Sequence, residues 1–109
     1  MKDQNQLEIE GVEALKRLLP IAQGFSGQCR IVAAFLLGLY DGNRFPFNMN
    51  DFRVLDHAVF TDCLAVLRMD ANPKKEVHTY FDNGNAIWEE LAVAWSIKDH
   101  INKNLGATK

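Results

Sequence analysis

The sequence predicts an all-α protein: a single compact bundle of about five helices around a central buried helix at about residues 27–40. Three observations favour this fold class. Apolar residues recur at three- and four-residue steps in four segments, which is the period of a helix with a buried face. Sustained apolar and polar alternation, the pattern of a half-buried strand, is absent outside residues 75–82. The 109 residues, 48% of them hydrophobic, suit one domain with one core.

The first helix is expected at about residues 8–23. Residues 1–7 lack any helical period, so we expect a frayed lead-in there. Pro20 should kink this helix or end it one turn early, because proline lacks a backbone N–H and its ring clashes with the preceding turn. The apolar face is formed by Val12, Leu15, Leu19 and Ala22.

The central helix should begin after Ser26, whose side chain can cap it, and continue to about residue 40. Its apolar residues surround nearly the whole circumference, which is typical of a helix packed among others. Its longest apolar run, residues 31–40, is far shorter than the roughly 20 residues of a membrane span. We therefore expect a core helix, no membrane association, and Gly42 as a left-handed C-cap.

Two helices are expected in the middle of the chain. Asn48 can cap a short one that ends near residue 54, and Asp56 can cap a longer one at about residues 57–69. Apolar residues at helical spacing predict one buried face on the longer helix. That face is formed by Phe60, Cys63, Leu64 and Leu67.

The C-terminal third is less regular. Residues 75–82 fit either a helical turn or one face of a strand, and we favour a short helical turn that ends at Gly84. Asn85 should then cap a last helix that continues through Ile97 and Ile101 and frays near residue 104. The residues expected to be largely buried in the whole bundle are Phe35, Leu36, Phe60, Leu64, Leu67, Trp88 and Leu91.

Residue types that carry metal, phosphate or nucleophilic chemistry lack the spacing of a site. Cys29 and Cys63 form no Cys-x-x-Cys pair, and the three histidines show no zinc-binding spacing. The glycine turn at residues 24–27 lacks the Lys-Ser/Thr of a phosphate-binding loop. We expect no catalytic residue, no cofactor and no metal. A Cys29 nucleophile with His78 as its base is the enzymatic alternative to a Cys29 that packs as a small apolar residue.

The charge balance argues against a general attraction for nucleic acid. Twelve Lys and Arg residues stand against fourteen Asp and Glu residues, for a net charge of -2. The helices that could act as recognition helices carry few basic residues. A small nucleic-acid-associated regulator is therefore the alternative function and not the favoured one. No cationic, apolar leader is present and no cysteine framework is evident, so we expect reduced thiols and a cytoplasmic location.

Charged and aromatic residues alternate in two stretches, residues 40–52 and 76–83. Arg and aromatic side chains are enriched at binding hot spots, so we predict a protein-interaction surface here. The alternative is a structural role, in which the rings of Phe45 and Phe47 point inward and Arg44 pairs with Asp41 or Asp56. The predicted surface consists of Arg44, Phe45, Phe47, His78 and Tyr80.

Two motifs are distinctive, Gly-Gln-x-Arg at residues 27–30 and Glu-Val-His-x-Tyr-Phe at residues 76–81. With residues 33–47 and 63–70 they resemble a domain-of-unknown-function family of small proteobacterial proteins found largely on integrative elements and plasmids. The resemblance implies a bacterial accessory protein and carries no activity or catalytic residue. We therefore expect a non-enzymatic protein-interaction or accessory module with a protein partner, which could modulate a host or mobile-element complex.

Overall fold

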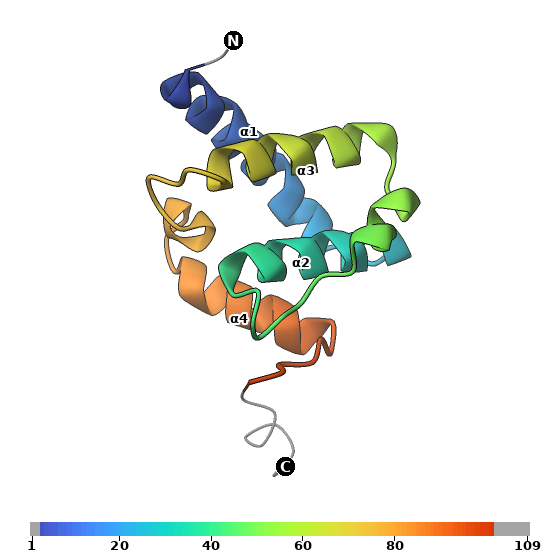
Figure 1. Ribbon diagram of the computed structural model, residues 1–109. Helices are drawn as coiled ribbons and strands as arrows, with labels where there is room; N and C mark the ends of the chain where they lie inside the picture. The colour runs from blue at the N-terminus through green and yellow to red at the C-terminus, as the bar shows by residue number, and fades with distance from the viewer. Residues whose placement is uncertain (1–2, 102–109) are drawn as a thin grey trace.

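Helices account for all regular secondary structure in residues 3–101, the part of the chain that the computed structural model describes (Figure 1). The predicted all-α class is confirmed. Helix α2 packs against α1, α4 and both 3₁₀-helices, so it is central as predicted. In chain order the elements are α1 (Gln4–Ala22), α2 (Gly27–Tyr40), the 3₁₀-helix η1 (Met49–Val54), α3 (His57–Asp70), the 3₁₀-helix η2 (Val77–Tyr80) and α4 (Gly84–Ala94).

Helix α1 begins earlier than the sequence predicts. The Asp3 carboxylate accepts a hydrogen bond from the Gln6 backbone N–H at 2.8 Å and so caps a helix that starts at Gln4. The predicted fraying of residues 1–7 is therefore wrong from residue 4 onward, and the two residues before Asp3 lie outside the described part. Pro20 lies within α1, which continues to Ala22, so the helix does not end one turn early.

Helices α1 and α3 pack closely along much of their length, and Gly11 lies where they approach each other. A Cβ atom at Gly11 would lie only 2.5 Å from the Cβ of Met69 in α3. At the edge of this contact the Arg17 guanidinium donates to both carboxylate oxygens of Asp62, at 3.0 and 2.8 Å. The absence of a side chain at Gly11 thus allows the two helices their close approach.

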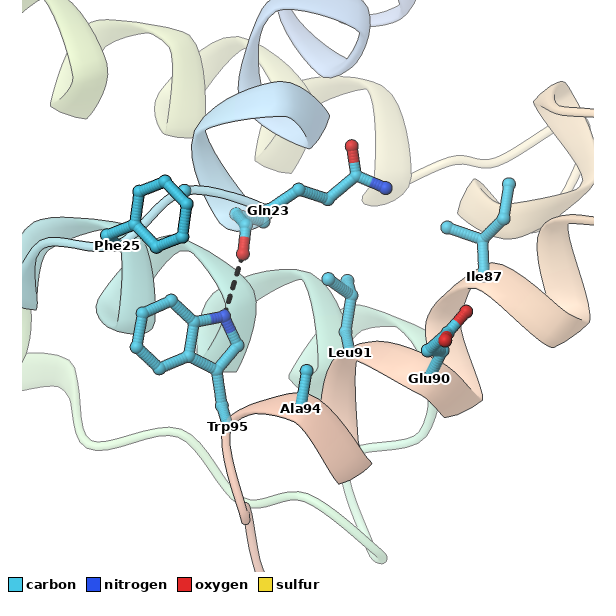
Figure 2. Close-up of a pocket in the computed structure, with 9 residues that line it drawn as sticks. Gln23, Phe25, Ile87, Glu90, Leu91, Ala94 and Trp95 are labelled. Atoms are coloured by element: carbon cyan, nitrogen blue, oxygen red, sulfur yellow. Dashed lines mark hydrogen bonds between the residues drawn. The ribbon is translucent and has the colours of Figure 1, made fainter.

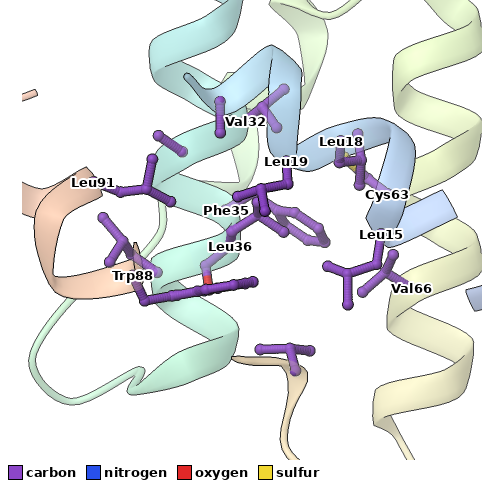
Figure 3. Packing of buried hydrophobic residues seen from close by; sticks show 14 of the residues in the cluster. Leu15, Leu18, Leu19, Val32, Phe35, Leu36, Cys63, Val66, Trp88 and Leu91 are labelled. Carbon is purple, nitrogen blue, oxygen red and sulfur yellow. The ribbon is translucent and has the colours of Figure 1, made fainter. Parts of the chain in front are cut away.

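The core lies between α1, α2, α3 and α4 (Figure 3). The predicted burial of Phe35, Leu36, Trp88 and Leu91 is confirmed, since each is at most 3% exposed. The predicted face of α3 is partly wrong, because Phe60, Leu64 and Leu67 are only partly buried. Both possible faces have helical spacing, so the period alone does not select one. The residues that α3 buries are Val59, Cys63, Val66 and Met69.

The predicted caps at the end of α2 and at the start of α3 differ in the structure. Gly42 does not adopt the left-handed conformation. Helix α2 ends at Tyr40 with Asp41 as its C-cap, and the Asp41 carboxylate accepts from the N–H groups of Asn43 and Arg44 at 3.1 and 3.2 Å. Asp56 occupies the N-cap position of α3 but makes no side-chain cap. Its carboxylate instead accepts from the Gln28 amide at 3.2 Å, which connects the start of α3 to α2.

Both ends of α4 also differ from the prediction. The helix begins at Gly84 after Asn83, which has a left-handed φ of 57°, so Asn85 lies inside the helix and does not cap it. The helix ends at Ala94 and does not continue through Ile97 and Ile101. Ser96 is left-handed, and the Ile97 N–H donates to the carbonyl of Ala92 at 2.9 Å, which closes the helix in a Schellman motif. The predicted fraying at 104–109 lies outside the described residues.

Two predicted caps and the type of one ambiguous segment agree with the structure. Ser26 caps α2 by accepting from the Cys29 N–H at 3.4 Å. Asn48 caps η1 by accepting from the Asn50 N–H at 3.0 Å. The ambiguous segment at 75–82 contains the helical turn η2 and no strand, as predicted. The turn ends at Tyr80 and not at Gly84, because Phe81 is extended and Gly84 already begins α4.

Candidate functional site

Arg44, the first residue of the predicted interaction surface, lies at the centre of a charge network. It follows α2 in the turn that Asp41 fixes, and its side chain is 18% exposed. Its Nη1 and Nη2 donate to the two carboxylate oxygens of Glu89 at 2.7 and 2.9 Å, and its Nε donates to Asp99 at 2.8 Å. Hydrogen bonds from the guanidinium lower the pKa of Glu89, and these two carboxylates raise the pKa of Arg44.

Two other members of the predicted surface lie close to this network. Phe45 is 2% exposed, and the Arg44 guanidinium lies 4.7 Å from the centre of its ring. The His78 ring lies 4.9 Å from the ring of Tyr40, whose hydroxyl donates to Glu89 at 2.5 Å. His78 Nδ1 is buried without a hydrogen-bond partner among the residues described.

The last two members of the predicted surface have different neighbours. Phe47 is half-buried, and its ring centre lies 5.8 and 5.0 Å from those of Phe35 and Phe52. Tyr80 donates to Glu8 of α1 at 2.8 Å. Burial, together with this hydrogen bond, raises the pKa of Tyr80 to about 12. The structure thus distributes the five residues over three separate sets of contacts, and Phe47 and Tyr80 do not contact the Arg44 network.

A groove lies on another part of the molecule, between the C-terminal end of α1 and helix α4 (Figure 2). We call it the α1–α4 groove. Its volume is about 490 Å³, and most of its lining is apolar. It is lined by Ala22, Gln23, Gly24 and Phe25 on the α1 side and by Ile87, Glu90, Leu91, Ala94 and Trp95 on the α4 side.

One end of the α1–α4 groove carries two aromatic side chains (Figure 2). Phe25 is 99% exposed, the highest exposure among the large hydrophobic residues described. Trp95 is half-buried, and its indole N–H donates to the carbonyl of Ala22 at 2.7 Å. This bond holds the end of α4 against the turn that carries Phe25. Ile87 and Glu90 lie at the opposite end of the groove (Figure 2).

The sequence pattern does not reveal the α1–α4 groove. Phe25 falls in the glycine turn at residues 24–27, and Trp95 falls within the last helix that the pattern predicts. The signal that could have pointed to Phe25 is a bulky aromatic residue between Gly24 and Ser26, where no helical period gives it a buried position.

Chemistry at Cys29 lacks the proposed base. The Cys29 sulfur lies 3.2 Å from the Ser26 hydroxyl, and this hydrogen bond lowers the pKa of the thiol. The ring contacts of His78 are with Tyr40 and Trp88, and no contact joins it to Cys29. Both cysteines are free. Within residues 3–101 no group of three or more His, Cys, Asp or Glu side chains is arranged to hold a metal ion.

Fold and site together define a small all-helical protein with an apolar surface groove. The chain belongs to the family of unknown function DUF7673, whose family model matches residues 12–96. The predicted resemblance to a domain of unknown function is confirmed to that extent. Searches of curated proteins and of solved structures give no match. In the part of the chain described, no helix has the length and apolar character needed to cross a bilayer.

Proposed function

We propose that this chain is a non-enzymatic protein-interaction module that binds its partner through the α1–α4 groove. The observation that carries the proposal is the position of Phe25, 99% exposed beside an apolar groove of about 490 Å³. Covering apolar surface is favourable by about 25 cal/mol per Å². A fully exposed phenylalanine adds nothing to the core of its own chain. Its apolar surface therefore contributes favourable free energy only when another molecule covers it.

The groove has the features of a binding hot spot. Aromatic residues dominate such regions, and they lie in concave, well-packed places. The hydrogen bond from Trp95 to Ala22 fixes one wall before any partner arrives, which reduces the conformational entropy that binding costs. Leu91 at the base of the groove is only 3% exposed and belongs to the core, so the base is rigid.

The alternative, a nucleic-acid-associated regulator, receives less support. Three of the cations that could contact phosphates are already in ion pairs within the chain: Arg17 with Asp62, Arg44 with Glu89 and Asp99, and Lys74 with Glu8. We retain a protein partner, a cytoplasmic location, and an accessory role for a bacterial host or mobile-element complex as parts of the proposal. The interaction surface predicted from the sequence, which includes Arg44, stays a separate prediction, and the Arg44→Ala variant tests it.

Matched arginine substitutions on α4 test the proposal. Ala94 lines the groove and Val93, 77% exposed, does not, while both are helical positions open to solvent. Wild-type protein, Ala94→Arg and Val93→Arg are immobilised, and the proteins captured from the native host are compared by quantitative mass spectrometry. We expect a partner that wild type and Val93→Arg retain equally and that Ala94→Arg loses. Equal capture by all three proteins, or equal loss in both variants, would contradict binding through the groove.

A further inference from the structure

The shape of the α1–α4 groove indicates the form of its occupant. Along α4 and its C-cap residue, the lining extends from Ile87 to Trp95, which are eight positions apart. At about 1.5 Å per residue, this corresponds to a groove of about 12 Å, or about two helical turns. An amphipathic helix lies in such grooves with apolar residues at i and i+4, so a short helical segment fits the length.

The charge of the groove indicates the charge of the partner. Glu90 is the one charged residue in its lining, is exposed, and has no ion-pair partner within residues 3–101. Its neighbour Glu89 is already paired with Arg44. From residue 76 to residue 97 the chain contains no Lys or Arg, and the one histidine, His78, packs against Tyr40 and Trp88. A partner that covers the groove removes water from the Glu90 carboxylate, which is costly unless a cation replaces that water.

From these two observations we propose, on the basis of the interaction function above, that the α1–α4 groove binds a basic amphipathic helix of a partner protein. Two apolar side chains about one turn apart enter the groove, one toward Phe25 and Trp95 and the other toward Ile87. A Lys or Arg on the same segment pairs with Glu90. Negatively charged helices are disfavoured, because they bring a second carboxylate to a groove that already carries one.

A second copy of this chain fits the groove less well. A two-fold dimer uses the same patch on both subunits, so it places both α4 helices and both Glu90 carboxylates in one interface. The segment from residue 76 to residue 97 has no Lys or Arg to offset them. The charge pattern therefore favours a different, basic partner.

A peptide selection tests this inference without knowledge of the natural partner. The probe is a display library of randomised 16-residue peptides, enriched on the full-length wild-type protein and depleted on Ala94→Arg. We expect the enriched sequences to combine apolar residues at i and i+4 with a Lys or Arg within one turn. The best peptide is then synthesised with that basic residue and with Glu in its place, and the affinity of each for wild type and Glu90→Lys is measured by calorimetry.

The charge exchange separates the two proposals. We expect Glu90→Lys to weaken the binding of the basic peptide about tenfold and to strengthen the binding of the acidic one, whereas Val93→Gln, which adds no charge beside Glu90, leaves both affinities unchanged. The charge inference is wrong if the peptide does not bind Ala94→Arg but binds Glu90→Lys and wild type with equal affinity, or if acidic peptides are enriched. In both cases the interaction function stands. If no enriched peptide distinguishes wild type from Ala94→Arg, both proposals fail. A dimer in sedimentation that Ala94→Arg dissociates would also overturn the inference.

Discussion

Replacement of Arg44 by alanine distinguishes a structural arginine from a recognition residue. In the structure this side chain is 18% exposed and joins α2 to α4 and to the segment after α4 through Glu89 and Asp99. Alanine would remove every one of these bonds and take the guanidinium away from two partly buried carboxylates. We therefore expect Arg44→Ala to destabilise the fold, whereas a residue that acts only on an external partner would leave it unchanged.

The magnitude follows from the burial of the network. Exposed ion pairs contribute at most about 1 kcal/mol, and breaking a fully buried pair costs about 3–5 kcal/mol. The side chains of Arg44, Glu89 and Asp99 are 18%, 39% and 21% exposed, so the network lies between these limits. We expect a loss of about 2 kcal/mol in the free energy of unfolding at pH 7, which for a domain of this size lowers the melting temperature by about 10 °C.

The pH dependence of the free energy of unfolding gives a second test of Arg44→Ala. Because Arg44 lowers the pKa of Glu89 in the folded state, this interaction stabilises the protein above the ordinary Glu pKa of 4.5 and is lost as the pH falls through the lowered value. The difference between wild type and Arg44→Ala should therefore shrink at pH 3.

Urea denaturation of wild type, Arg44→Ala and Arg53→Ala at pH 7 and pH 3 measures both effects. Arg53 in η1 is exposed and has no ion-pair partner in the described residues, so its variant should stay within about 0.5 kcal/mol of wild type. An Arg44→Ala midpoint equal to wild type at pH 7, or a penalty that is the same at both pH values, would refute the structural role.

Three further outcomes are expected from denaturation experiments. Gly84→Ala should cost about 2 kcal/mol or more, because a Cβ there overlaps the carbonyl oxygen of His78, whereas Gly27→Ala meets nothing within 4 Å and should be neutral or slightly stabilising. Met69→Ala should cost about 2–5 kcal/mol and Leu64→Ala clearly less, and the reverse order would restore the face of α3 predicted from the sequence. Burial, with a smaller contribution from Glu76, raises the pKa of Asp70 to about 6. The folded state then holds the proton of the Asp70 carboxyl group more tightly than the unfolded state does. The free energy of unfolding of wild type should therefore fall as the pH rises from 4 to 6, and it should fall less in Asp70→Asn.

The existence of the helices was predictable because it depends on local order in the sequence. The apolar period, the Ser26 cap and the Asn48 cap all depend on residues within a few positions of each other. Asp56 shows where this reasoning stops. It has the chemistry of a cap, yet its carboxylate accepts from Gln28, which is 28 positions earlier, and no local pattern reveals that competitor.

The two candidate sites were predictable to different degrees for the same reason. The composition around Arg44 marked it as a residue with a special role, but its partners Glu89 and Asp99 lie 45 and 55 positions away. The α1–α4 groove is assembled from residues 22–25 and 87–95, which meet only when α4 packs beside the end of α1. The sequence pattern of the first segment alone predicts a turn, and that of the second alone predicts an amphipathic helix.

Helix α4 connects the stability of the bundle to the proposed binding function through two adjacent glutamates. Successive residues on an α-helix point about 100° apart, so Glu89 and Glu90 face different surroundings. Glu89 is bound by Arg44 and by the Tyr40 hydroxyl, and its charge is used within the fold. Glu90 lines the groove and has no such partner in residues 3–101, so its charge is available to another molecule. Trp88, Leu91 and Ala92 anchor the same helix in the core, so a partner that occupies the groove would meet a rigid helix. In the proposed complex, the Glu90 carboxylate beside this apolar surface would select which partners the groove binds.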